Sequence, residues 1–114
     1  MTSNYTQERL EFKTVTIAIG ETVSTALDLI GKIPVAIITP SAITGSSFGV
    51  QVSSDNDTYY NYYNTSGTLV TIAVGASRWI GIVPADFANA RHIKLVSNSA
   101  EGAERTITIV MRGM

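Results

Sequence analysis

The chain has 114 residues, which is the size of one domain, and a formal net charge of −1. This charge gives no basic field to hold a polyanion, so we expect no nucleic-acid partner. The absence of cysteine excludes a disulfide framework and thiolate metal sites. Charged residues make up only 15% of the chain, against a typical share of about 25%. Much of the surface must therefore be Ser, Thr, Asn or apolar, which suits burial against partners.

Residues 1–12 show no alternation of apolar and polar side chains and carry mixed charge, so we expect an arm that precedes a domain over 13–114. This N-terminus is polar and lacks the apolar region of a signal peptide. No run reaches the roughly 20 apolar residues of a membrane span. We therefore expect no membrane partner, and a protein that folds in the cytoplasm where it is made.

From residue 13 onward, apolar and polar side chains alternate, as they do when successive side chains point to opposite faces of a strand. The first predicted strand is 13–19, with Val15, Ile17 and Ile19 on one face. Turn residues follow about every 8 to 12 positions, the spacing of sandwiches and barrels. Further strands are predicted at 33–38, 48–53, 59–63, 68–74, 78–83, 92–97 and 106–112, with 23–29 as strand or turn and 84–90 as a single helical turn. The predicted fold is a single-domain, all-β antiparallel sandwich, and a jelly roll is one topology that fits this prediction.

Residues that usually carry catalysis or bind metals are scarce. The only imidazole, His92, should share the solvent side of its strand with Lys94, and we predict no enzyme. Acidic residues such as Glu101 lie beside turn residues and are interpreted as turn formers. Asp55 and Asp57 offer two oxygen ligands to calcium, but such pairs are far commoner in turns without metal. We therefore predict no metal site and no cofactor.

Five residues, 59–63, contain four tyrosines. Alternation places Tyr60 and Tyr62 on one face and Tyr59 and Tyr63 on the other, so only one pair can lie in the core. The other pair would anchor a protein partner or stack on a sugar ring, or would form aromatic pairs on a solvated sheet face. Trp79 lies within an apolar strand and is predicted to fill the core.

Several segments over residues 29–112 together resemble small virion proteins of tailed bacteriophages and prophages. They are FGVQVSSD at 48–55, TYY at 58–60, RWI at 78–80, PADFANARHIKL at 84–95 and AERTITIV at 103–110. The resemblance implies a structural role, with a capsid decoration (cement) protein on the outer face of an icosahedral head as the closest analogy. Tail and neck components share such sandwiches.

This resemblance implies that the major capsid protein is the partner and that the chain is located on the capsid surface of the virion. Small, weakly charged domains gain binding strength from symmetric association, so we expect a homo-oligomer, and specifically a trimer on the capsid lattice. The arm would order on a neighbouring subunit or on the shell. The candidate interface residues are Tyr5, Leu10, Phe12, Tyr59, Tyr60, Tyr62 and Tyr63.

The VQVSSD segment at 50–55 and the aromatic residues after it also look like the hairpin of jelly-roll carbohydrate-binding modules. The chain departs from those modules because it lacks a clear set of exposed tryptophans and convergent charged groups. A module that binds a glycan is therefore the alternative function.

Overall fold

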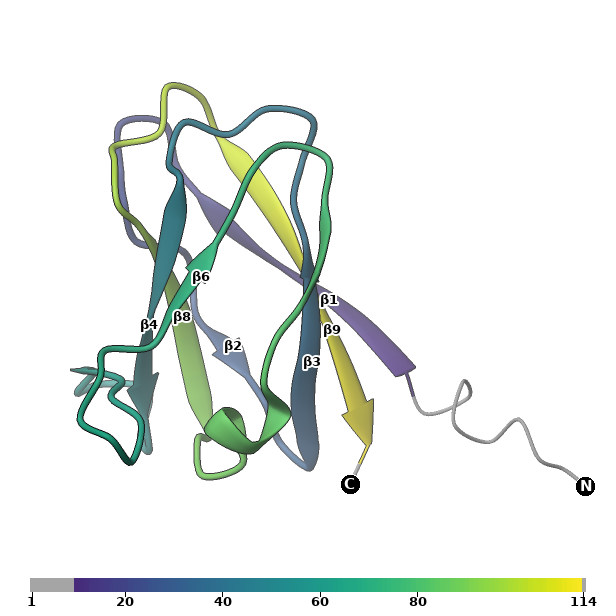
Figure 1. Ribbon diagram of the computed structural model, residues 1–114, viewed down its shortest axis with the longest axis vertical. Coiled ribbons are helices and arrows are strands. Elements are labelled where there is room, and N and C mark those ends of the chain that lie inside the picture. The colour runs from purple at the N-terminus through teal and green to yellow at the C-terminus, as the bar shows by residue number, and fades with distance from the viewer. Residues whose placement is uncertain (1–9, 114) are drawn as a thin grey trace, which may run out of the picture.

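The computed structural model describes residues 10–113 and is built almost entirely of strands. The elements are β1 (Leu10–Ile17), β2 (Leu27–Asp28), β3 (Lys32–Ile38), β4 (Ser47–Ser53), β5 (Tyr60–Asn61), β6 (Thr71–Ala73), β7 (Trp79–Gly81), a 3-10 helix (Pro84–Phe87), β8 (His92–Ser97) and β9 (Arg105–Gly113). They form two antiparallel sheets that pack face to face (Figure 1). Sheet A has the order β1-β9-β3-β7 and sheet B the order β2-β8-β4-β5, with β6 also paired to β4. The predicted antiparallel sandwich is confirmed.

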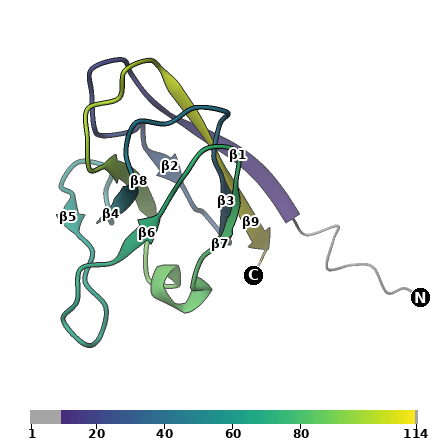
Figure 2. The ribbon, with the colours of Figure 1, turned by 45° about the horizontal axis from the view of Figure 1, so that its top comes forward.

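The strand order is that of a jelly roll. β1 pairs with β9, β2 with β8, and β3 with β7, while β4 pairs with β5 and β6 at different points along its length. The first and second halves of the chain thus lie side by side, like a long hairpin that has been wrapped into two sheets (Figure 2). Within residues 10–113, no helix is long and apolar enough to cross a membrane.

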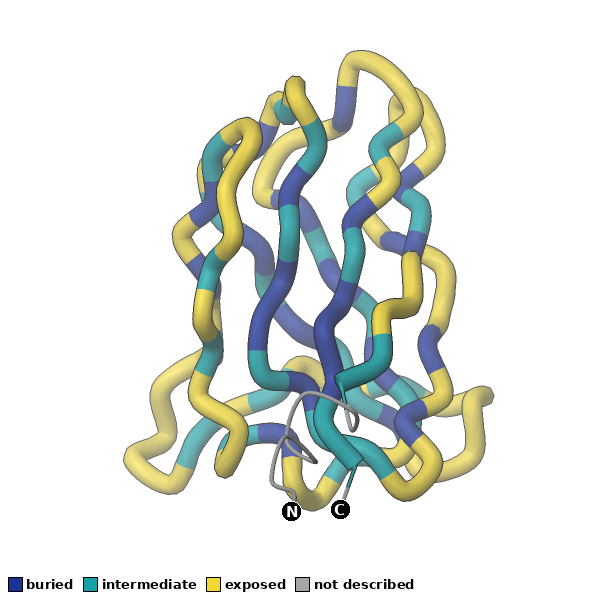
Figure 3. Tube along the Cα trace, turned by 90° about the vertical axis from the view of Figure 1, so that its right-hand side faces the viewer, coloured by how far each residue is buried: buried dark blue, intermediate teal, exposed yellow. Residues whose placement is uncertain are grey.

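The core lies between the sheets and follows the predicted alternation. Val15 and Ile17 of β1 are buried, as are Ile107 and Ile109 of β9, and Phe48 of β4 is fully enclosed. Buried positions run along the middle of the strands, and exposed ones gather in the loops at both ends (Figure 3). Burial of such side chains is the main term that stabilises the fold.

The first strand begins three residues earlier than predicted. β9 extends to Gly113, so its last residues give backbone partners to Leu10, Glu11 and Phe12, and these residues belong to β1 rather than to an arm. The strand also ends earlier, at Ile17. Beyond that point Ile19 is 69% exposed, not in the core as alternation predicted. Residues 1–9 of the predicted arm lie outside the described residues.

Other boundaries follow the sequence more closely. β8 has the predicted bounds, and the predicted helical turn is the 3-10 helix. The ambiguous segment 23–29 is mostly loop and contributes only the two residues of β2. Val23 forms an isolated bridge to Val96, so this segment follows β8 without forming a continuous strand.

Candidate interaction surface

The outer face of sheet A carries buried apolar residues. Val110 lies between Ile109 and Met111, which face the core, and therefore points outward. Its register partners are Phe12 on β1 and Ala36 on β3. Val110 and Ala36 are nevertheless only 1% and 4% exposed. Something on the outer face must cover them.

The cover is an aromatic pair drawn from the two edge strands of sheet A. β1 and β7 are three strand spacings apart, about 14 Å, yet the ring centroids of Phe12 and Trp79 are 6.2 Å apart, with planes at 78°. Both side chains must therefore reach inward over β9 and β3. Phe12 is still 52% exposed and Trp79 61% exposed. We name them the Phe12–Trp79 pair.

The prediction that Trp79 fills the core is wrong. Ile80 is the residue of β7 that packs toward the core, and it pairs with buried Ile37 of β3. Alternation then turns Trp79 and Gly81 outward. This phase packs two large apolar groups, Ile80 and Ile82, against the core, whereas the opposite phase would turn one ring and a glycine inward. Space above Gly81 is open, since an added Cβ would meet no atom within 4 Å.

Two of the candidate tyrosines pack against the fold. Tyr62 contacts the core, and its ring lies 6.0 Å from that of Phe87. Burial raises the pKa of Tyr62, with a further contribution from the charge of Asp86. The ring of Tyr59 lies under Lys94 Nζ, at 4.3 Å from the ring centroid. Tyr59 and Tyr62 are therefore largely engaged within the chain.

The other two tyrosines are exposed, Tyr60 by 67% and Tyr63 by 54%. Neither predicted pair enters the core as a whole, because β5 has only two residues and Tyr63 makes an isolated bridge to Leu69 beyond its end. Tyr60 pairs with Val52 and lines a hollow of about 230 Å³ with Asn89. Tyr5 lies outside the described residues.

Arg91 also lines this hollow. Its Nε donates to Asp28 Oδ1 at 2.7 Å and its Nη2 to Oδ2 at 3.3 Å, so the guanidinium is held by two bonds. The bond from Arg91, helped by the Ile30 amide, lowers the pKa of Asp28 to about 2. The hollow thus combines an exposed aromatic ring with an oriented cation.

Asp55 acts as a turn former, as predicted. Its Oδ1 accepts bonds from the amides of Asp57 and Thr58 at 2.9 and 3.0 Å, and from the Ser53 hydroxyl at 3.0 Å. These bonds, the Thr58 amide foremost, lower the pKa of Asp55. Over residues 10–113, no three His, Asp or Glu side chains gather as a metal site would require. His92 lies on β8 opposite Ser53.

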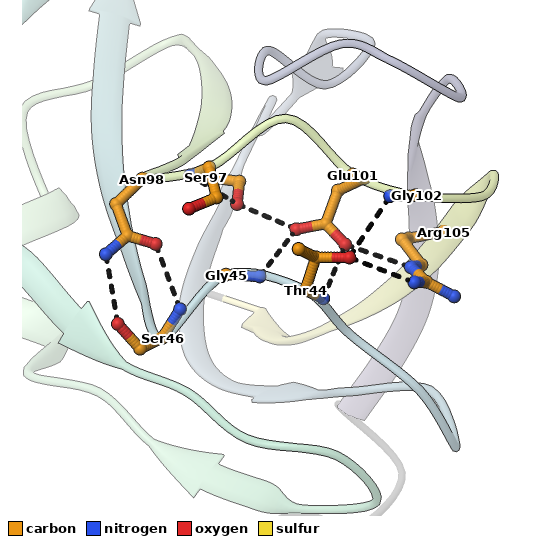
Figure 4. Close-up of polar contacts among 9 residues, drawn as sticks. Thr44, Gly45, Ser46, Ser97, Asn98, Glu101, Gly102 and Arg105 are labelled. Atoms are coloured by element: carbon orange, nitrogen blue, oxygen red, sulfur yellow. Dashed lines mark hydrogen bonds and ion pairs between the residues drawn. The ribbon is translucent and has the colours of Figure 1, made fainter.

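Glu101, interpreted from the sequence as a turn former, is a buried carboxylate that is only 1% exposed. One oxygen accepts from the Thr44 amide at 2.8 Å and from Arg105 Nε at 2.9 Å. The other accepts from the Gly45 amide at 3.0 Å and from the Ser97 hydroxyl at 2.7 Å (Figure 4). Burial opposes ionisation of Glu101, but these four bonds outweigh it and lower its pKa to about 2. Glu101 links the β3–β4 loop to the β8–β9 loop, and its role is to stabilise the fold.

No family model matches the sequence. No curated protein matches it either. Among solved structures, the chain superposes on YomS, a protein derived from the SPBc2 prophage, with a TM-score of 0.58 and 8% identity. The superposition covers 90% of this chain and 93% of YomS. At this identity the likeness shows a shared fold.

Two carbohydrate-binding modules superpose more loosely. A CBM32 module from a family 31 glycoside hydrolase of Clostridium perfringens gives a TM-score of 0.43 with 9% identity, covering 97% of this chain and 98% of the module. A chitosan-binding module from Paenibacillus sp. IK-5 gives 0.40 with 18% identity, covering 87% of this chain and 75% of that one. Scores at this level support no argument about function.

Proposed function

We propose that the chain is a non-enzymatic structural protein of a tailed-bacteriophage particle, and that it binds and stabilises the outer surface of the capsid. The observation that carries this proposal is the exposed Phe12–Trp79 pair on the outer face of sheet A. The fold shared with a prophage-derived protein supports the phage setting, as does the resemblance of residues 29–112 to small virion proteins.

The chemistry of this face suits a protein partner. Aromatic rings, and tryptophan above all, are enriched among the residues that dominate binding energy at protein interfaces. Beneath the rings lie Val110 and Ala36, which are apolar and carry no charge. A net charge of −1 leaves little long-range attraction, so affinity must come from contact area.

The partner in this proposal is the major capsid protein, and the chain is located on the virion surface. Many copies on one lattice would multiply a modest contact, and association of the chain with itself is one way to do so. A tail or neck component would use the same face on a different part of the particle. Isolated shells and isolated tails distinguish these two locations.

Trp79 provides the test of this proposal. Replacing Trp79 by Ala should weaken binding to purified empty shells by roughly 2 kcal/mol or more, about thirtyfold in Kd, because the ring is the largest exposed apolar group of the face. Co-sedimentation of the protein with shells over a range of concentrations measures this. Since Trp79 is 61% exposed, thermal unfolding should stay cooperative.

Ile30 is a matched control, because it is also 61% exposed but lies in the turn between β2 and β3. Ile30→Ala should bind shells as the unaltered protein does. Equal binding by the Trp79 and Ile30 variants would contradict the assignment of the face. Binding to tails but not to shells would indicate that the chain is a tail or neck component.

A second candidate function is glycan binding at the hollow between Tyr60 and Arg91. An exposed ring can stack on a sugar face while Asn89 and Arg91 donate hydrogen bonds to hydroxyls. The hollow's volume of about 230 Å³ is below that of a drug-sized pocket, roughly 300 to 1,000 Å³. It would hold part of a saccharide rather than enclose it.

If the hollow binds a glycan, Tyr60→Ala should lower the affinity by about 1–3 kcal/mol, in analogy with base stacking on aromatic rings. The melting temperature should be unchanged, since Tyr60 is 67% exposed. Tyr63→Ala, at an exposed tyrosine outside the hollow, is the control. Calorimetry against a glycan panel checks this, and no heat of binding at millimolar glycan would remove the candidate.

A further inference from the structure

The edge of β1 has a defined hydrogen-bonding pattern. Thr16 donates its amide to Thr25 Oγ1 at 3.0 Å and accepts from the Thr25 amide at 2.9 Å, so its backbone groups point away from β9. In an antiparallel pair, residues alternate between bonding the partner strand and pointing away from it. Leu10, Phe12 and Thr14 therefore also direct their N–H and C=O groups to the outer edge.

That outer edge is open over its N-terminal half. Thr25 covers Thr16, but no described residue pairs with the edge at Leu10, Phe12 or Thr14. In both ribbon views this end of β1 points away from sheet B, so neither sheet obstructs the approach of another strand (Figures 1 and 2). An exposed strand edge with unpaired backbone groups is a template for strand addition.

We propose that the occupant of this edge is a second copy of the chain, with β1 paired antiparallel to β1 about a two-fold axis at Phe12. Phe12 then faces Phe12 of the other copy, and Leu10 faces Thr14. The pairing joins two A sheets into one continuous sheet. It is isologous, so it closes at two copies.

The charge pattern of β1 selects this register. With the axis at Phe12, Glu11 of each copy lies opposite Lys13 of the other. An axis at Glu11 would place two carboxylates face to face, and an axis at Lys13 would place two ammonium groups face to face. An axis at Thr14 would require the backbone groups of Thr16, which Thr25 already occupies.

Registers that place an even-numbered residue of one copy opposite an odd-numbered residue of the other are excluded for a different reason. They would set outward-pointing backbone groups opposite groups that already bond β9. Among registers that pair residues 10–14 of the two copies, only the axis at Phe12 both forms the backbone hydrogen bonds and places opposite charges across from each other. Glu11 and Lys13 are then a non-hydrogen-bonded pair, in which side chains approach more closely.

The side chains of this edge are available for the contact. Side-chain exposure is 34% for Glu11 and 54% for Lys13, and within one chain Glu11 already lies 3.3 Å from Lys13 and 2.9 Å from Lys32. Pairing would bring each carboxylate a further cation. On the outer face, the two Phe12–Trp79 pairs would meet at the axis and form one longer aromatic strip.

Charge-reversal substitutions in β1 of the free protein test the pairing without any capsid. Light scattering of the purified chain should give twice the 12.2 kDa of one copy. Lys13→Glu creates two carboxylate pairs across the axis and Glu11→Lys creates two ammonium pairs. Each variant should raise the dimer dissociation constant on the order of tenfold or more. An equimolar mixture of the two restores both opposite-charge pairs and should return to the mass of a dimer.

Two further variants control for the charge change and block the open edge directly. Glu104→Lys makes the same charge change as Glu11→Lys at an exposed position outside the strands, and it should leave the dimer intact. Thr14→Pro removes an amide that points to the open edge and none that bonds β9, so it should give a monomer that still unfolds cooperatively. A wild-type mass of one or three copies would overturn the proposal. So would a dimer that neither charge variant weakens.

Discussion

Replacing Glu101 by Gln is expected to lower the free energy of unfolding at neutral pH by about 3 kcal/mol. The carboxylate is buried and its pKa is about 2 in the folded chain, against 4.5 for a free glutamate. Each pKa unit corresponds to about 1.4 kcal/mol of preference for the ionised form. The glutamine side chain lacks the charge that pairs with Arg105, and its NH₂ group would face a backbone amide, Thr44 or Gly45, that needs an acceptor. Urea unfolding of both proteins at pH 7 measures the difference.

The same carboxylate makes stability depend on pH. The folded-state pKa of Glu101 is depressed, so its contribution is present above the unfolded pKa and is lost as the pH falls from about 5 toward 2. The unaltered protein should lose stability over that range, and Glu101→Gln should lose less of it. Glu104→Gln, at an exposed carboxylate in the same loop, should follow the unaltered protein. Parallel stability curves for the Glu101 variant and the unaltered protein would contradict this role.

Replacing Gly45 by Ala is expected to destabilise the protein by roughly 2 to 3 kcal/mol. A Cβ at this position would lie 2.2 Å from Ser97 Oγ and 2.9 Å from Asn98 Oδ1. Relief of this clash must either move the β3–β4 loop or rotate the Ser97 hydroxyl, and each change breaks a bond to Glu101, from the Gly45 amide or from Ser97. Thermal and urea unfolding both report the loss.

Gly102 supplies the control, because its added Cβ would meet Thr44 Oγ1 at an ordinary 3.6 Å. Gly102→Ala should change the free energy of unfolding by less than about 1 kcal/mol. Gly45→Ala should also cost less in a Glu101→Gln background, since both changes disrupt the same network. Equal stability of the Gly45 and Gly102 variants would show that the loops are not held together in this way.

The sandwich could be predicted from the sequence because its signals are local. Alternation along a strand and the turn residues between strands depend only on neighbouring positions. β8 illustrates this, because His92–Ser97 alternates cleanly and its predicted bounds hold. The seven-residue strand β4 was predicted to within one residue for the same reason.

Features set by distant partners could not be predicted in this way. Glu101 looks like a turn residue in sequence, because its partners Thr44 and Gly45 lie 57 and 56 positions away. The direction in which Trp79 points depends on the register of β7 against β3, which alternation alone leaves open. Leu10 and Phe12 belong to a strand only because β9 is long enough to pair with them.

Some of the candidate interface residues are exposed and others pack within the chain. Phe12 is on the exposed face with an aromatic partner, but that partner is Trp79, which the sequence placed in the core. Tyr60 and Tyr63 are exposed as an interface would need, whereas Tyr59 and Tyr62 contact Lys94 and Phe87 of their own chain. The surface therefore combines residues from strands that are adjacent neither in sequence nor in the sheet.

Trp79 reports directly on the proposed binding of the particle by the outer face of sheet A, because it is the only tryptophan of the chain. The protein can be made with 5-hydroxytryptophan at this position, so that its emission is separated from that of shell tryptophans. The measurement is quenching by acrylamide with and without an excess of empty shells. We predict strong quenching of the free protein, where Trp79 is 61% exposed, and a marked fall when shells bind. Shells that bind the protein while Trp79 stays fully accessible, or that do not bind it, would contradict the proposal.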